Sequence, residues 1–204
     1  MSSAAGRGAN GALARCAGMG SSSAVPTLRP ALRADLPALL QLIDLSVRAL
    51  SRGFYTPAQI ESGLRHVFGP DTQLIDDGTY FILVEDETLV AAGGWSRRRT
   101  LYGGDQAKDG PDPLLDPARE SARIRAFFVH PDHSRRGHAR RLYDRCAAEA
   151  ATSGFRSLEL MATLPGEPLY LALGFQPLER EAPELPDGER LPMVHMQRII
   201  QAQV

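Results

Sequence analysis

The feature of this sequence that most limits its fold is an apolar strand that passes, through a short turn, directly into a helix. Residues 123–129, "RIRAFFV", have the length and apolar content of a buried strand, and the Pro-containing turn "HPDHS" follows them. Apolar side chains then recur at helical spacing from Ala139 to Ala150, and Gly154 ends the helix. A chain with this junction is predicted to belong to the mixed α/β class, in which helices pack on a sheet.

The hydrophobic periodicity before the junction predicts further strands and helices. A capping box of Thr56 and Gln59 around Pro57 marks the start of one helix, and Asp35 is expected to cap another. The acidic turn 85–87 joins two β-rich runs in a hairpin. In chain order we therefore expect a strand at 26–32, helices at 36–50 and 57–68, and strands at 79–84 and 89–95.

The remaining segments complete the predicted α/β domain, in which no internal repeat is found. Residues 97–121 are rich in Gly, Pro and Asp without sustained periodicity, which is typical of a long connection that carries function. After the junction, residues 155–163 are expected to form a strand. A short helix then ends at Gly174, and two more strands lie around the "PDGE" turn.

The composition excludes several classes of protein. The 204 residues carry 23 basic and 24 acidic side chains, so no overall field attracts nucleic acid or an anionic membrane. The basic residues are not interleaved with aromatic residues on which bases could stack, and no apolar run approaches the roughly 20 residues of a membrane span. Cys16 and Cys146 make no disulfide framework. We therefore expect a soluble, cytoplasmic protein with no nucleic-acid or membrane partner.

The first 25 residues differ in composition from the rest of the chain. They are Gly, Ala and Ser with scattered Arg, and the first carboxylate of the chain is Asp35. Such a segment buries too little apolar surface to offset the entropy of ordering it, so residues 1–25 are predicted to be disordered. The composition also fits an organelle transit peptide, which is the alternative to a cytoplasmic location. Residues 26–204 are predicted to form a single domain.

The start of the helix after the turn is a candidate anion site. A helix start offers unpaired N–H groups and the positive end of the helix dipole. Gly137 lets the backbone approach an anion closely, and Ala139 keeps the next turn uncrowded. Arg135 and Arg136 add charged donors. Because the segment lacks the GxxxxGK[ST] pattern of a Walker loop, we expect a phosphate cradle of another kind.

Three histidines in and after the turn raise the question of a metal site. His130, His133 and His138 lack the HExxH spacing, and Asp132 is the one clear carboxylate near them. We therefore expect histidines in contact with solvent and no metal.

Two motifs resemble the GNAT superfamily of acyl-CoA-dependent N-acetyltransferases. "VHPDHSRRGHA" resembles its pyrophosphate motif, a strand ending in Val-x-Pro followed by Gln/Arg-x-x-Gly-x-Gly/Ala, and Ser134 departs from it where Gln or Arg is usual. "LYLALGF" resembles its Tyr-x-x-x-Gly-Phe motif at the expected distance downstream. The resemblance covers roughly residues 26–200 and implies a mixed, mostly antiparallel sheet that is splayed at its middle strands.

The resemblance also implies a cofactor site and a catalytic acid. Acetyl-CoA would be the co-substrate, with no metal. Tyr170 would protonate the leaving thiolate, because a phenol with a pKa near 10 is still protonated at neutral pH. The expected cofactor-binding residues are Phe127, Phe128, Val129, Arg135, Arg136, Gly137, His138, Ala139, Arg140 and Thr163.

The general base and the acceptor are less fully specified. Some family members place a Glu on the central strand where this chain has Arg123, so we name Glu159, with Glu85, water or an already neutral amine as alternatives. Arg123, Arg125 and Trp95 are expected at the acceptor, where cations would suit an amine that also bears a carboxylate.

These inferences predict direct acetyl transfer to a primary amine of a small molecule in a ternary complex. Cys146 lies on the apolar face of its helix, which is a poor place for a nucleophile. The alternatives are a protein N-terminal or lysine acetyltransferase and a non-catalytic acyl-CoA-binding regulatory module. The oligomeric state is left open between a monomer and a homodimer.

Overall fold

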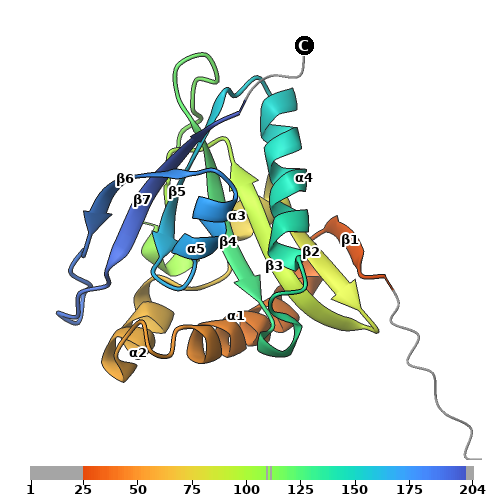
Figure 1. Cartoon of the computed structure of the whole chain (residues 1–204). Coiled ribbons are helices and arrows are strands. Elements are labelled where there is room, and N and C mark those ends of the chain that lie inside the picture. Colours follow the sequence, from red (N-terminus) through yellow and green to blue (C-terminus); the bar gives the residue numbers. More distant parts are fainter. Residues whose placement is uncertain (1–24, 109, 111, 201–204) are drawn as a thin grey trace, which may run out of the picture.

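The computed structural model describes residues 25–108, 110 and 112–200, which fold around one twisted sheet (Figure 1). The predicted disorder of residues 1–25 falls, apart from Val25, outside the described residues. The seven strands are β1 (Thr27–Pro30), β2 (Tyr80–Glu85), β3 (Thr88–Ser96), β4 (Ala122–Val129), β5 (Ser157–Thr163), β6 (Gln176–Glu181) and β7 (Met193–Ile199). The α-helices are α1 (Leu36–Leu50), α2 (Pro57–His66), α3 (Thr72–Asp76), α4 (His138–Thr152) and α5 (Glu167–Ala172).

The sheet splits between its two middle strands. Its order is β1-β2-β3-β4-β5-β7-β6, and every neighbouring pair is antiparallel except β4 and β5. These two pair only at Ala122↔Leu158 and Arg123↔Glu159. Beyond that point β4 stays with β3, and β5 stays with β7. The predicted fold class, a mixed and mostly antiparallel sheet that is splayed in the middle, is therefore confirmed.

A β-bulge lies in β4 where it leaves β5. Ala126 has a φ of +55°, and the register against β3 shifts between Ala92↔Phe128 and Gly94↔Arg125. The Tyr80 hydroxyl donates a hydrogen bond of 3.0 Å to the Ala126 carbonyl and so stabilises the bulge. A bulge bends its strand and increases the local twist, so this one turns β4 away from β5.

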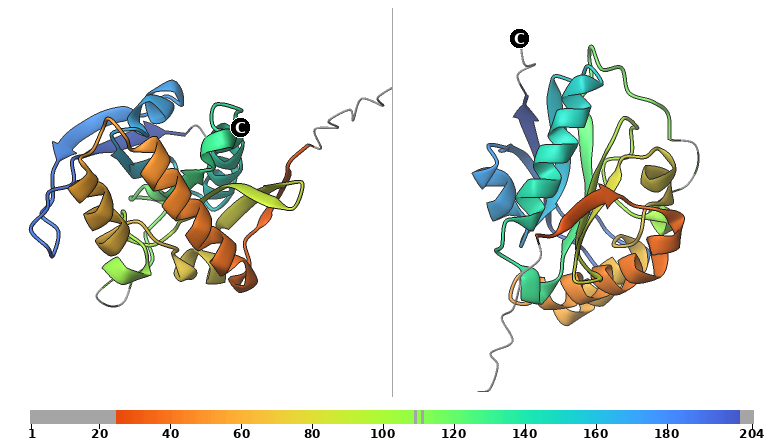
Figure 2. Two further views of the ribbon diagram at one scale, coloured as in Figure 1. Left: turned by 90° about the horizontal axis from the view of Figure 1, so that it is seen from below. Right: turned by 90° about the vertical axis from the view of Figure 1, so that its right-hand side faces the viewer.

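Helices cover both faces of the sheet (Figure 2). On one face, Leu142 and Cys146 of α4 pack with Phe81 of β2. On the other face, Leu39 of α1 packs with Ile82 of the same strand. Successive side chains of β2 therefore point into two separate hydrophobic cores, because side chains alternate between the faces of a sheet. Among the helices that the structure describes, none is long and apolar enough to cross a bilayer.

The helix starts match the sequence predictions with one difference. The reciprocal capping box of Thr56 and Gln59 is present at α2. Asp35 precedes α1 as expected, but its side chain makes no hydrogen bond to that helix. It accepts instead from Arg29 and from the N–H of Leu32, because an ion pair with the preceding strand is within reach. The short helix α3, between the predicted helix 57–68 and the predicted strand 79–84, was not expected.

Candidate active site

A cavity of about 980 Å³ opens where β4 and β5 separate. Its walls come from the free edge of β4, the start of α4, the start of α5 and the end of α1. The loop 101–104 closes it on another side. Nine of the ten predicted cofactor residues line this cavity, namely Phe127, Phe128, Val129, Arg135, Gly137, His138, Ala139, Arg140 and Thr163. Arg136 does not line it and is exposed.

The backbone at one end of the cavity is shaped to hold an anion. Arg135 has a φ of +62° and Gly137 a φ of +84°, and left-handed residues within a tight loop turn successive N–H groups toward one point. Gly137 is the N-cap of α4, and no side chain of the described residues caps this helix. The first N–H groups of the 15-residue helix therefore lack a capping partner. A Cβ at Gly137 would meet no protein atom within 4 Å, so there is room for a ligand.

The middle of the cavity exposes a strand edge. Past Arg123 the backbone of β4 has no partner on the β5 side, so its peptide groups are free to bond an extended ligand. Two groups past Arg123 already have side-chain partners: the N–H of Val129 donates to Oγ of Ser46 at 3.2 Å, and the Ala126 carbonyl accepts from the Tyr80 hydroxyl. Thr163, near the end of β5, lies on the opposite wall.

Tyr170 lies in the cavity wall on α5. Its side chain is largely buried, and its ring packs edge to face with Phe127 at a centroid distance of 6.4 Å. Burial raises the pKa of Tyr170 well above its usual value, so the phenol keeps its proton at neutral pH. The hydroxyl makes no hydrogen bond to any residue that the structure describes. It is therefore a free proton donor at the cavity wall.

Arg123 and Glu159, by contrast, bind each other at the closed end of the split. Arg123 donates to the Glu159 carboxylate, which also accepts from Nε2 of Gln197 at 3.0 Å. Nε2 of His195 lies 3.4 Å from the same carboxylate. Burial acts to raise the pKa of Glu159, but the charge of Arg123 and the other contacts outweigh it and lower the pKa. Neither side chain lines the cavity.

Trp95 does not line the cavity and packs in the core beneath α4. Its indole N–H donates to Glu149 of α4 at 3.1 Å, and its ring packs edge to face with Phe155. Strand alternation in β3 explains this placement, since Trp95 points into the core beneath α4. The structure thus does not bring Trp95 to the predicted acceptor site.

Arg125 reaches the cavity, but its charge is already paired. It is 3% exposed and forms an ion pair of 2.8 Å with Asp71. Its guanidinium also donates to the carbonyls of Thr100 at 2.7 Å and Gly103 at 2.5 Å, while Lys108 binds Asp71 from the other side. Arg125 therefore anchors the loop 97–108 instead of presenting a free cation.

The far end of the cavity is apolar, and sequence reasoning did not find its walls. No acidic side chain lines the cavity within the part of the chain that the structure describes. The apolar positions come from five separate segments, which only the tertiary fold brings together. They are Val47, Leu50, Phe54, Phe68, Tyr102, Met161 and Met193.

The split sheet, the uncapped helix start and the buried tyrosine are arranged around one cavity, as the resemblance to an acyl-CoA-dependent acyltransferase implied. The model of the acetyltransferase (GNAT) family matches residues 43–175. The chain belongs to this family and is an acetyl-CoA-dependent N-acetyltransferase. The family resemblance predicted from the two motifs is thereby confirmed.

Solved structures of low sequence identity share the fold. A GCN5-related N-acetyltransferase from Rhodopseudomonas palustris is 19% identical over 87% of this chain and 98% of its own, with a TM-score of 0.62. The PaiA N-acetyltransferase from Thermoplasma acidophilum, in complex with coenzyme A, is 12% identical over 87% and 100%, with a TM-score of 0.58. The ribosomal-protein-S18-alanine N-acetyltransferase from Escherichia coli is 18% identical over 88% and 97%, with a TM-score of 0.53. No curated protein sequence matches the chain.

Proposed function

We propose that this enzyme acetylates a primary amine on a small molecule whose body is apolar, by direct attack in a ternary complex. The observation that carries the proposal is the lining of the cavity away from the start of α4, which is mostly apolar and includes no carboxylate among the described residues. An apolar wall binds an alkyl or aromatic group, and it offers no hydrogen-bond or ion-pair partner to a strongly charged substrate.

The residues of the chain divide the work along the cavity. The N-terminal N–H groups of α4 and the Arg135 side chain would hold the phosphates of acetyl-CoA, and the free edge of β4 would hold the extended arm. Bound acetyl-CoA supplies the thioester carbonyl that the amine attacks. As the C–N bond forms and the C–S bond breaks, the Tyr170 hydroxyl gives its proton to the departing sulfur.

The attacking amine must lose a proton, and no carboxylate among the described residues lines the cavity to accept it. Glu159 is held by Arg123, and neither Glu159 nor Glu85 lines the cavity, which argues against both as the base. We infer that the amine arrives neutral or gives its proton to water, which the sequence had left open beside the two glutamates.

The acceptor prediction changes accordingly. A carboxylate-bearing amine needs a cation that is free to bind it, but Arg125 is held in an ion pair with Asp71, and Arg123 in one with Glu159. We therefore expect amines without a carboxylate to be preferred over amino acids of the same size.

A matched panel of acceptors tests the proposal. Phenethylamine and hexylamine are compared with phenylalanine and norleucine, which add a carboxylate, and with short peptides that have a free N-terminus. The rate is followed as thiol release from acetyl-CoA. We expect kcat/KM for the simple amines to exceed that for the amino acids by at least about tenfold. The reason is that the amino-acid carboxylate would lose its contacts with water and find no free cation in the pocket. A preference for the peptides would favour a protein acetyltransferase, and binding without turnover of any acceptor would favour a regulatory module.

A further inference from the structure

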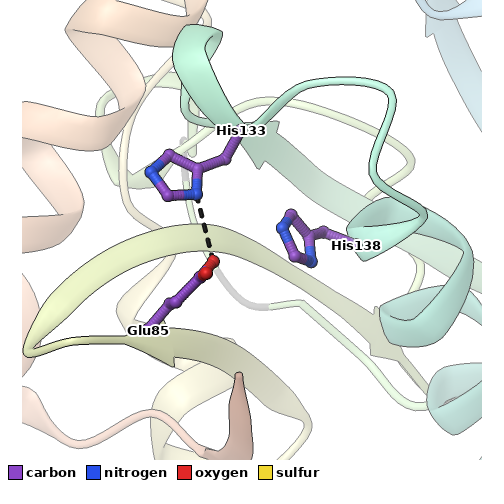
Figure 3. A group of neighbouring side chains, drawn as sticks. All are labelled: Glu85, His133 and His138. Atoms are coloured by element: carbon purple, nitrogen blue, oxygen red, sulfur yellow. Dashed lines mark hydrogen bonds and ion pairs between the residues drawn. The ribbon is translucent and has the colours of Figure 1, made fainter. Parts of the chain in front are cut away.

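Three side chains from separate segments converge beside the anion end of the cavity (Figure 3). Glu85 ends β2, His133 lies in the turn after β4, and His138 is the first residue of α4. Each offers a ligand atom, and these atoms all lie within 4.8 Å of one another. Nδ1 of His133 is 3.1 Å from the Glu85 carboxylate.

Burial separates this group from an ordinary surface cluster. His138 is 8% exposed, and its Nε2 is buried without a hydrogen-bond partner among the described residues. The side chains of His133 and Glu85 are 21% and 12% exposed. A buried polar nitrogen without a partner costs free energy, so it points to a ligand that the protein side chains do not supply.

The expectation of solvent-exposed histidines is therefore wrong for His138. The sequence showed Asp132 as the nearest carboxylate, but the carboxylate that joins the histidines is Glu85, which is 48 residues from His133 along the chain. The pairing of β2 with β3, and of β3 with β4, brings it there.

We propose that Glu85, His133 and His138 bind a divalent transition-metal cation, with zinc the best match. Two imidazole nitrogens and one carboxylate oxygen are a usual donor set for zinc, which leaves a fourth position for water. Ligands of a tetrahedral zinc at about 2.0–2.1 Å lie roughly 3.3 Å apart, so small side-chain rotations close the site from the observed spacing.

The position of the site gives it a consequence for the cofactor, which rests on the proposed function. His133 and His138 bracket residues 134–137, the loop that shapes the anion cradle, and both histidines line the cavity. A cation bound to both would fix the two ends of this loop and add positive charge beside the phosphates. Zinc should therefore tighten the binding of coenzyme A.

Calorimetric titration of the full-length, untagged chain with zinc chloride tests the site. A Cys16→Ser background keeps that thiol from binding the metal, and cobalt(II) in a parallel titration reports tetrahedral coordination by its visible absorption. We expect one zinc per chain with a micromolar or tighter Kd, raised at least about tenfold in Glu85→Gln and in His133→Asn. Both substituted side chains are partly exposed, and circular dichroism confirms folding.

His130→Asn is the matched control. His130 packs edge to face with His133 at a centroid distance of 5.4 Å, but it is not one of the three ligands. Zinc affinity should be unchanged in this variant. Absence of zinc binding in the background protein, or affinity equal to it in both ligand variants, would overturn the proposal. A Kd for coenzyme A that does not fall with zinc would overturn only the coupling, and acetyl transfer without added zinc would still support the proposed function.

Discussion

At the scale of single residues, Tyr170 carries the most specific chemical role. The hydroxyl has no hydrogen-bond partner among the described residues, and burial raises its pKa. The phenol is therefore protonated and available to donate its proton, and it makes no structural hydrogen bond that its removal would break. We expect Tyr170→Phe to lower kcat by about 10²–10⁴-fold with little change in the KM for acetyl-CoA. Steady-state kinetics at saturating acceptor measure this.

Tyr143→Phe is the control for that experiment. Tyr143 is also buried and also packs on Phe175, but it lies outside the cavity wall and its hydroxyl accepts a hydrogen bond from Arg198 at 2.7 Å. Loss of the Tyr143 hydroxyl should lower the free energy of unfolding, because the hydrogen bond with Arg198 is lost, and should leave kcat unchanged. Equal kcat values for the two variants would remove Tyr170 from the chemistry.

Glu159 gives a prediction about pH and stability. Its pKa is lowered in the folded chain, so the ionised carboxylate contributes stability above the ordinary carboxyl pKa of 4.5, and this is lost as the pH falls through the lowered value. Glu159→Gln should therefore lower Tm near pH 7, with the difference from wild type shrinking toward acid pH. Thermal unfolding across that range measures it.

The same variant tests the base role that the sequence predicted for Glu159. Because the carboxylate is held by Arg123 and does not line the cavity, we expect acetyl transfer to be retained. A large loss of kcat with an unchanged Tm would instead support a catalytic base.

At the scale of elements, the loop between β3 and β4 depends on one buried ion pair. Arg125 and Asp71 are 54 residues apart, and together with Lys108 they hold the loop that walls the cavity. Asp71→Asn leaves the Arg125 charge without its partner, so the free energy of unfolding should fall by about 3 kcal/mol. Chemical denaturation measures this loss. Asp76→Asn, at an exposed ion pair with Arg33, should leave stability nearly unchanged, and equal losses would contradict the account.

The elements that the sequence predicted are those with local signals. The strand-to-helix junction, the hairpin and the capping box of Thr56 depend on neighbours along the chain, and all three are present. The bulge at Ala126 was not predicted, because its cause is the register of β4 against another strand. The role of Asp71 was not predicted, since nothing in its neighbouring sequence shows that it pairs with Arg125 of a strand far along the chain.

At the scale of the whole molecule, the site exists because two strands part. Residues of β4 and of the start of α4 were assigned to the cofactor, and Tyr170 of α5 to catalysis, from motifs, and the structure gathers most of them around one cavity. The apolar acceptor end joins α1, the 101–104 loop and β7, so it depends on tertiary packing that no motif records. Tertiary packing also explains why Arg123 and Arg125 are not the free cations that we predicted from the sequence. The fold pairs each of them with a carboxylate from a distant segment.

The central claim is that the start of α4 holds the phosphates of acetyl-CoA, and calorimetric titration with acetyl-CoA tests it most directly. Wild type is compared with Gly137→Glu and with Gly188→Glu, since both glycines have nearly equal positive φ (84° and 85°) and open space at the Cβ position. Backbone strain is therefore matched, but only Gly137 adjoins the cavity. We predict that Gly137→Glu raises Kd at least about tenfold, by charge repulsion, and that Gly188→Glu leaves it unchanged. Equal affinity in all three proteins would contradict the account.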